Sequence, residues 1–273
     1  MPGSNPRALE KARMLPADAL ILDLEDAVAP DAKEAARAQV ADAVTAKGFG
    51  KREVIVRVNA PGSAWGEADF AAAVAAGPDA ILVPKVSTLQ DIHRAEYLMG
   101  EADIDLWAMV ETPLAILNVA ALAAAGGRLA CFVMGTNDLV KELRGEHMRD
   151  RSNLASALSL TVLAARANGI AAIDGVFNDI SDADGFDAHC RQAKAFGFDG
   201  KTVIHPSQVD TANAIFAPSA VEVEAARKVI AAFELAENRG KGAIKLDGRM
   251  VELLHAEIAR RTVAMADAIA ELA

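Results

Sequence analysis

The feature that most constrains the fold is a regular alternation of short apolar runs with longer alanine-rich stretches. The apolar runs lie at residues 19–24, 53–58, 80–85, 106–111, 131–135, 170–176 and 201–205. Amphipathic stretches typical of helices separate them, at residues 31–47, 66–76, 88–100, 113–125, 152–168 and 182–196. Because the runs are almost continuously apolar, they indicate strands buried on both faces of a parallel sheet. The alternation therefore predicts βα units.

Two α/β architectures have this rhythm, and the charged residues decide between them. A doubly wound sheet that binds a dinucleotide carries a G-x-G-x-x-G turn, which is absent from this sequence. A (β/α)8 barrel instead gathers functional residues at the C-terminal ends of many strands. Charged residues end or follow the seven runs here: Glu25–Asp26, Arg57, Lys85, Glu111, Asp138, Asp174 and His205. We therefore predict a (β/α)8 TIM barrel with one shared polar site.

No linker, repeat or low-complexity segment divides the chain. We predict that the barrel covers residues 1–238 and that its last helix lies at about 219–238. A glycine-rich loop at 239–248 and an amphipathic helix from about 250 to 272 follow it. We expect residues 239–273 to form a C-terminal helical arm that acts as a lid and is not an independent domain.

Composition excludes several classes of protein. Hydrophobic residues make up 52% of the 273 residues, so the chain can build a large core. The formal net charge of −10 opposes binding to nucleic acid or to an anionic membrane, and the 4% of aromatic residues provides few base-stacking platforms. Two cysteines cannot form a disulfide framework. The start of the sequence lacks the apolar stretch of a signal peptide, and we expect a cytoplasmic protein.

Glu111 and Asp138 are the sharpest pair of candidate functional residues. They lie 27 residues and one βα unit apart, so adjacent barrel strands place the two carboxylates side by side. Two carboxylates without a histidine or cysteine partner suit a hard cation such as Mg²⁺, whose remaining positions water or substrate oxygens fill. The alternative is structural, because Asn137 or Asp138 in GTNDL could cap the next helix.

Charged groups at the earlier strand ends have two interpretations each. Arg57 either binds a carboxylate or developing enolate, or neutralises Glu25 or Asp26, and both roles can hold together. Glu25 and Asp26 could serve as acid/base groups. We favour a supporting role, in which one caps the next helix and the other orients an arginine. Lys85 could form a Schiff base, but neighbouring carboxylates would keep it charged, which favours an ion pair.

The remaining titratable groups and turns give weaker signals. His205, before Pro206, is either a base, a ligand or a structural histidine. We expect the other histidines to lie at the surface, and neither cysteine has the context of a nucleophile. The turns at 2–7 (PGSNPR) and 197–201 (GFDGK) could each offer backbone amides and one cation to a phosphate.

Several strings of residues together resemble the citrate lyase β-subunit-like family, which includes malyl-CoA and citramalyl-CoA lyases. They run in order along almost the whole chain: PGSNPRALEKA, LDLEDAVAPDAKEAAR, VRVNAPG, VPKV, VETP, GTNDL, GFDGKTVIHPSQV and the tail IFAPS…GKGA…DGRMVE. Each string is short, but the combination is specific. The resemblance implies a (β/α)8 barrel that cleaves or forms a carbon–carbon bond between a CoA-thioester enolate and a 2-oxo acid.

The resemblance also implies roles for particular residues. Mg²⁺ would bind to the residues that match the family's ligands, Glu111 and Asp138, and the matching Arg57 would bind the keto-acid oxygen. The backbone amides of Gly135, Thr136 and Asn137 could hold the carboxylate of the 2-oxo acid. CoA phosphates are expected near the N-terminal turn, at Ser4, Asn5 and Arg7. Family members assemble as trimers or hexamers, so a homotrimer or hexamer is expected.

The sequence departs from the family pattern at both ends. Relatives carry a strand before the PGSN turn, whereas this chain begins at that turn, so we expect the first barrel strand to be truncated and the natural start to lie upstream. In the tail, the family's Met-Ile-Asp is replaced by Met250-Val251-Glu252. The family aspartate is a proposed acid/base group supplied by a neighbouring subunit. Glu252 is therefore a candidate catalytic residue, or a glutamate that only stabilises a helix start.

Our leading interpretation is an Mg²⁺-dependent lyase acting on a malyl-CoA or citramalyl-CoA type of substrate, with glyoxylate, pyruvate or oxaloacetate as the 2-oxo acid. Three alternatives remain open. One is a thioesterase on the same substrates, and another is a citrate lyase β subunit that uses an acyl-carrier-protein thioester and partner chains. The third is a catalytically inactive CoA-binding barrel.

Overall fold

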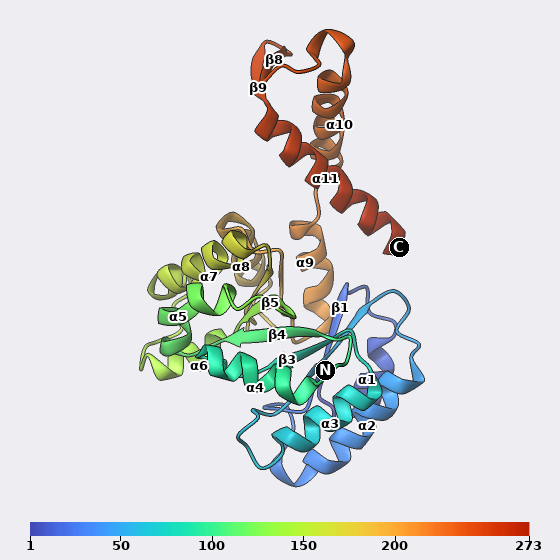
Figure 1. Ribbon diagram of the computed structural model, residues 1–273, viewed down its shortest axis with the longest axis vertical. Helices are drawn as coiled ribbons and strands as arrows, with labels where there is room; N and C mark the ends of the chain where they lie inside the picture. Colours follow the sequence, from blue (N-terminus) through green and yellow to red (C-terminus); the bar gives the residue numbers. More distant parts are fainter. Residues whose placement is uncertain (273) are drawn as a thin grey trace. The chain divides into compact units, whose positions relative to one another are not determined.

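The predicted βα units are present in the computed structural model, which describes residues 1–272 except the side chain of Ala236. Seven parallel strands form one sheet in the order of the sequence, β1 to β7 (Figure 1). The first six apolar runs coincide largely with strands: β1 Ala19–Asp23, β2 Glu53–Arg57, β3 Ala80–Val83, β4 Asp105–Val110, β5 Leu129–Met134 and β6 Ala171–Asp174. The seventh run, 201–205, overlaps the two-residue β7 Gly200–Lys201 only at Lys201. The prediction of a TIM-barrel-like α/β fold is thus confirmed.

Helices follow the strands, and local sequence signals set where many of them begin. Thr88 and Asp91 form a reciprocal capping box at α4, Thr112 caps α5 ahead of Pro113, and Asp182 caps α8. Between residues 1 and 216 the α-helices are α1 Pro6–Ala12, α2 Lys33–Ala46, α3 Gly66–Ala76, α4 Leu89–Met99, α5 Pro113–Ala123, α6 Thr136–Glu142, α7 Ala155–Asn168, α8 Ala183–Phe196 and α9 Val209–Phe216.

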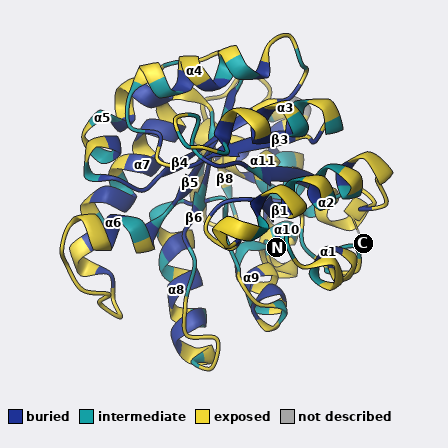
Figure 2. Ribbon diagram, turned by 90° about the horizontal axis from the view of Figure 1, so that it is seen from below, coloured by how far each residue is buried: buried dark blue, intermediate teal, exposed yellow. Residues whose placement is uncertain are grey.

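The sheet provides the core and one polar end. Figure 2 shows its strands buried and the surrounding helices exposed on their outer sides. Ile55, Leu82, Trp107 and Val133 pack together on one face of the sheet. Because side chains alternate between faces, the residues at 23, 57 and 111 continue this same face beyond the apolar cluster. The core therefore determines which strand-end residues can meet.

The first residues of the chain pair with the free edge of β1. The Met1 carbonyl accepts a hydrogen bond from the Asp23 amide at 2.8 Å, and the Gly3 amide donates to the Asp23 carbonyl at 2.8 Å. Pro2 and Asp23 form one isolated parallel bridge. A Cβ at Gly3 would lie 2.7 Å from that carbonyl, so only glycine allows this approach. Within the described residues, this bridge is the pairing that β1 makes on the edge opposite β2.

Residues Asn213–Ala273 form a second compact unit, separate from the first unit of Met1–Ala212. In its described part, α10 Ala220–Glu234 packs against α11 Leu253–Leu272. The two units divide at 212/213, and α10 shares its core with the C-terminal elements: Phe233 packs with Ile244 and Ala256.

The sequence predicted a simple loop for the glycine-rich segment of the second unit, but the structure differs. It forms an antiparallel hairpin of β8 Ala243–Leu246 and β9 Arg249–Glu252. Asp247 and Gly248 have φ of 49° and 80°, the left-handed values of a tight hairpin turn. Glu252 therefore ends a strand directly before α11 and does not start the last helix.

Candidate active site

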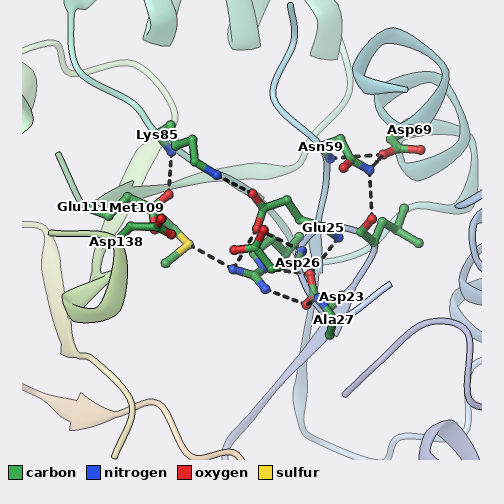
Figure 3. A network of polar contacts seen from close by, with 12 residues as sticks. Asp23, Glu25, Asp26, Ala27, Asn59, Asp69, Lys85, Met109, Glu111 and Asp138 are labelled. Carbon is green, nitrogen blue, oxygen red and sulfur yellow. Dashed lines mark hydrogen bonds and ion pairs between the residues drawn. The ribbon is translucent and has the colours of Figure 1, made fainter. Parts of the chain in front are cut away.

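The candidate active site lies where β1, β2 and β4 end and where α6 begins. Asp23 and Arg57 are the last residues of β1 and β2, and Glu111 directly follows β4. Asp138 lies in the first turn of α6, three residues beyond the N-cap Gly135. Figure 3 shows Asp23, Glu25, Lys85 and Glu111 linked through Arg57 and backbone contacts in one polar network.

Arg57 is fixed by two carboxylates. Its Nε and one terminal nitrogen donate to the two Asp23 oxygens at 2.6 and 2.5 Å, which is the bidentate geometry of a strong pair. The other terminal nitrogen lies 3.1 Å from Glu25 Oε2. Burial by itself would raise the pKa of Asp23, but the hydrogen bonds and charge of Arg57 outweigh it and lower that pKa. Both predicted roles of Arg57 remain compatible, since it pairs with Glu25 and also reaches the site.

Glu25 joins the two cations of the site. Its Oε2 faces Arg57, and its Oε1 accepts a hydrogen bond from Lys85 Nζ at 2.8 Å. Its carboxylate thus orients an arginine, as expected. Asp26 is exposed and the expected helix cap is wrong, because α2 begins at Lys33 without a side-chain cap.

Lys85 connects Glu25 to Glu111. Its φ is 57°, in the left-handed region that non-glycine residues rarely adopt. This conformation directs its amide to Glu111 Oε1 at 2.8 Å while the ammonium reaches Glu25. Burial would lower the pKa of Lys85, but Glu25 raises it above its usual value. A charged lysine is a poor amine nucleophile, so the geometry supports the ion-pair role over the Schiff base.

Glu111 is a buried carboxylate without a cationic side chain as partner. It is 2% exposed, and in the described part of the chain no lysine, arginine or histidine forms an ion pair with it. Burial is the main cause that raises its pKa to about 7; the hydrogen bond from the Lys85 amide opposes this rise, and the charges of Asp138 and Glu25 add to it. A Cβ at Gly135 would lie 2.2 Å from Glu111 Oε2, so glycine at 135 makes room for this carboxylate. The site thus concentrates negative charge that a bound cation would neutralise.

Asp138 faces the same space as Glu111 (Figure 3). Its nearest cation is Lys141, 3.6 Å away and 79% exposed, which is a weak surface contact. It does not cap α6, whose N-cap is Gly135 without a side-chain hydrogen bond. Asn137 pairs with Asn178 at 3.1 and 2.8 Å and does not cap the helix either. The capping interpretation of GTNDL is therefore wrong.

The donor set fits a hard divalent cation. Glu111 and Asp138 offer carboxylate oxygens only, and within residues 1–272 no group of three or more histidine, cysteine, aspartate or glutamate side chains forms a ready-made metal cage. Mg²⁺ is the metal that proteins hold with one or two carboxylates while water or substrate oxygens complete the octahedron. Two converging carboxylates, one of them buried and unpaired, match that requirement.

A pH dependence of cation binding follows from Glu111. Its pKa of about 7 means that a proton competes with the metal below neutral pH. We expect the affinity for Mg²⁺ to fall about tenfold for each pH unit below 7 and to level off above it. Calorimetric titration with Mg²⁺ at pH 6, 7 and 8 measures this. An affinity that does not change between pH 6 and 8 would contradict the assignment of Glu111.

The backbone of Lys85 makes a second prediction possible. Lys85→Gly keeps the amide that binds Glu111 and relieves the left-handed strain, whereas Lys85→Ala keeps the strain. Both remove the ammonium. We expect Lys85→Gly to be about 1 kcal/mol more stable than Lys85→Ala, because glycine adopts positive φ without steric cost. Thermal unfolding of the two variants should show melting temperatures about 2–4 °C apart, and equal temperatures would refute backbone strain at this position.

Asp174 belongs to a separate buried cluster, so the expectation of one site shared by all seven strand ends is wrong. Its carboxylate binds Arg151 at 2.7 Å and Lys201 at 2.8 Å, and all three side chains are almost inaccessible. Lys201 therefore cannot serve a phosphate at the 197–201 turn. His189, expected at the surface, is buried against this cluster, and burial together with the Lys201 charge lowers its pKa to about 3.

The remaining candidates have local structural roles. His205 lies beyond the short β7, and its Nδ1 accepts a hydrogen bond from the Ser207 amide at the start of a 3-10 helix. This local contact supports the structural interpretation of His205 over that of a base or a ligand. Cys131 and Cys190 are buried free thiols whose pKa burial raises, which agrees with their lack of nucleophile context.

Two predicted binding segments are occupied in part by internal hydrogen bonds. Asn5 caps α1 by accepting from the Ala8 amide at 3.1 Å. The Gly135 amide donates to the Val110 carbonyl at 3.1 Å and cannot also bind a ligand. Of the three amides suggested for a substrate carboxylate, only those of Thr136 and Asn137 stay candidates.

Asp23 is the site residue that the sequence analysis missed. It is 5% exposed and accepts the Glu25 and Ala27 amides as well as both Arg57 contacts. A signal was available in the two-residue period of β1, which places Asp23 on the same face as Ile21 and opposite Arg57 in the register of β2.

Fold and site together define a TIM-barrel-like α/β protein with a carboxylate site for a hard cation beside a fixed arginine. Comparison with known families agrees: residues 1–206 match the HpcH/HpaI aldolase/citrate lyase family, and the chain belongs to this family of enzymes. The resemblance inferred from the sequence is thereby confirmed.

Named relatives extend over nearly the whole chain. The chain is 50% identical over 270 residues to a (3S)-malyl-CoA thioesterase of Cereibacter sphaeroides, covering 99% of this chain and 94% of the relative. It is 38% identical over 261 residues to the citrate lyase subunit beta of Escherichia coli, covering 92% of this chain and 86% of that protein.

Solved structures show the same fold. A CitE protein from Mycobacterium tuberculosis, in complex with magnesium, acetoacetate and coenzyme A, is 32% identical with a TM-score of 0.79, covering 97% of this chain and 96% of that one. A citrate lyase from Burkholderia xenovorans LB400 is 20% identical with a TM-score of 0.78, covering 91% and 83%, which supports the fold alone. Among the described helices, none combines the length and apolarity needed to cross a membrane.

Proposed function

We propose that this protein is an Mg²⁺-dependent enzyme that acts on a 3-hydroxyacyl-CoA of the malyl-CoA type, and that its reaction is hydrolysis of the thioester. The buried, unpaired Glu111 beside Asp138 and Arg57 is the observation that supports a cation and an acidic substrate. The choice of hydrolysis follows the 50% identity with a (3S)-malyl-CoA thioesterase along nearly the full length of both chains. The leading interpretation of the sequence is a lyase, and hydrolysis of the thioester is one of its three alternatives.

The chain's own residues supply binding and orientation. Glu111 and Asp138 would hold the metal, which when bound polarises the substrate oxygens it contacts. Arg57 Nη1, which pairs with Glu25, also makes a weak contact with Met109 Sδ at 3.6 Å, and a substrate oxygen is a better acceptor for that second N–H. Asp23 and Glu25 keep the guanidinium in place. Because it is already positioned, the guanidinium would stabilise a substrate oxygen that becomes negative during the reaction without having to move first.

Other predicted groups complete the proposal. The amides of Thr136 and Asn137 would bind the free carboxylate of the acyl group, and Ser4, Asn5 and Arg7 would lie along the CoA phosphates. Glu252 would move a proton between substrate and solvent. In a homotrimer or hexamer of this chain, a neighbouring subunit would supply this residue. Its side chain shows no ion pair within the described residues, and its amide donates to His255 Nδ1 at 3.0 Å.

Carbon–carbon cleavage is the second candidate. It is favoured by the same arginine and carboxylates, which suit the enolate and 2-oxo acid formed by a lyase, and by the 38% identity with a citrate lyase subunit beta. In that reaction Arg57 would stabilise the oxygen of the departing 2-oxo acid, glyoxylate in the case of malyl-CoA.

Product analysis distinguishes these activities. Purified protein is incubated with (3S)-malyl-CoA and Mg²⁺, and a parallel sample contains a chelator. We expect malate and free CoA in a 1:1 ratio, with turnover lost in the chelated sample. Acetyl-CoA with glyoxylate would identify the lyase. Coenzyme A binding without turnover would instead identify a non-catalytic barrel.

A further inference from the structure

A buried lysine lies behind the candidate active site and has no part in the chemistry proposed above. Lys33, the first residue of α2, is 6% exposed. Its ammonium donates three hydrogen bonds of 2.8 Å, to the carbonyls of Leu24 and Glu25 and to Asn59 Oδ1. All three acceptors are neutral oxygens, so the charge of Lys33 is buried without a direct carboxylate partner.

A second layer of buried polar groups holds Asn59 in turn. Its side-chain amide donates to the Leu24 carbonyl at 2.8 Å and to Asp69 Oδ2 at 2.5 Å, and its backbone amide donates to the same Asp69 oxygen at 3.0 Å. Asp69 is fully buried and accepts from Arg37 at 2.6 Å. Figure 3 shows Asn59 and Asp69 on the side of Glu25 away from Glu111.

The two carbonyls bound by Lys33 have a particular position. They belong to the peptide groups on either side of the Glu25 Cα, and fixing both sets the direction of the Cα–Cβ bond. From this backbone the Glu25 carboxylate reaches Arg57 at 3.1 Å and Lys85 at 2.8 Å. One ammonium group thus contacts both peptide groups that flank the residue whose carboxylate holds both cations of the site.

Stability alone does not account for a charge in this place. The carbonyls keep other donors without Lys33, since the Asn59 side chain binds Leu24 and the Val28 amide binds Glu25 at 3.0 Å. The loss of solvation of a buried ammonium offsets most of what its hydrogen bonds contribute, and apolar replacements of buried charges are often neutral or stabilising.

We propose that Lys33 is a positioning residue of the active site, which acts by holding the backbone of Glu25 so that its carboxylate orients Arg57 and Lys85. The kinetic part of this inference rests on the proposed function, whereas the structural part does not. The first test is therefore independent of any substrate.

Hydrogen–deuterium exchange measures how firmly the backbone of residues 24–29, which carries Glu25, is held. The amides of residues 25–28 all donate locally: to Asp23, to the Glu25 side chain and to the Glu25 carbonyl. In Lys33→Met we expect exchange in a peptide covering 24–29 to be at least tenfold faster, and exchange in β4 to be unchanged. Lys228→Met, at an exposed lysine of α10, serves as the control. Unchanged exchange at 24–29 would overturn the proposal.

Kinetics on malyl-CoA with Mg²⁺ provide the second test. Lys33→Met should lower kcat about 10- to 100-fold, the usual effect of removing a supporting partner, with KM changed less than threefold. In a Glu25→Gln background the same substitution should change kcat less than twofold, because its effect passes through Glu25. Independent, multiplicative effects would refute the mechanism.

Failure of the Lys33 proposal can be distinguished from misfolding of the variant and from a wrong substrate. If Lys33→Met does not fold, Lys33→Gln, which retains a donor, is measured in its place. If the wild type does not turn over malyl-CoA, the proposed substrate is wrong, and the exchange experiment still decides the role of Lys33.

Discussion

Replacing Glu111 by glutamine should abolish turnover while making the metal-free protein more stable. The substitution Glu111→Gln keeps the size of the side chain and an oxygen for the Lys85 amide, but removes the anionic oxygen that holds the cation. We expect kcat to fall at least about 10³-fold, the scale of losing a principal electrostatic group. Steady-state kinetics at an Mg²⁺ concentration that saturates the wild type measure this. Calorimetry on Glu111→Gln should detect no Mg²⁺ binding.

The stability change has a definite sign. The pKa of Glu111 rises from 4.5 to about 7 on folding, so the folded state favours the protonated carboxyl, and the metal-free protein loses stability as pH rises through that range. Above pH 7 the cost is about 3 kcal/mol, at 1.4 kcal/mol per unit. Glutamine cannot ionise and removes it. At pH 8 we expect Glu111→Gln to melt higher than the metal-free wild type.

Glu53 provides a matched control for this experiment. It is also a glutamate with a raised pKa, for which burial is the first cause, but it starts β2 at the opposite end of the sheet from Glu111. Glu53→Gln should leave kcat and Mg²⁺ affinity unchanged. Near-normal turnover of Glu111→Gln, or an equal loss in Glu53→Gln, would refute the site.

The fold could be predicted to the extent that burial shapes sequence. Strands of a buried parallel sheet are mostly apolar, and that property located β1 to β6, whereas the run at 201–205 meets the two-residue β7 only at Lys201. The β8–β9 hairpin was missed because its strands are half polar, although the Asp247-Gly248 pair is a strong turn signal. The packing of α10 against α11 could not be read from the sequence for a related reason, because it joins segments that the hairpin separates.

Site residues could be predicted singly, but not their partners. A charged residue at a strand tip indicates a site, yet the sequence does not say that Asp174 faces Arg151 and Lys201, which come from other elements. His189 was misplaced although Phe186, Cys190 and Ala193 lie on the same helical face, a pattern that marks the buried side of α8. Partner choice is set by tertiary geometry, which short motifs do not encode.

Breaking the ion pair between Arg57 and Asp23 should lower the stability of the protein more than the other substitutions considered. Arg57→Met leaves the Asp23 carboxylate, 5% exposed in the wild type, without its bidentate partner, and removing one member of a buried ion pair costs about 3–5 kcal/mol. For a protein of this size that lowers the melting temperature by roughly 10 °C. Because Arg57 lowers the pKa of Asp23, the loss should be greatest near neutral pH and shrink as acid protonates Asp23.

A double variant separates folding from catalysis at this position. Asp23→Asn combined with Arg57→Met removes both charges, so the melting temperature should recover to within about 4 °C of the wild type. Turnover should not recover, because the guanidinium that faces the developing negative oxygen is gone, and we expect kcat to stay about 10²–10³-fold low. Thermal unfolding and steady-state kinetics on the wild type, on Arg57→Met and on the double variant give both quantities. If activity returned together with stability, Arg57 would be only the counterion of Asp23, and its place in the active site would be wrong.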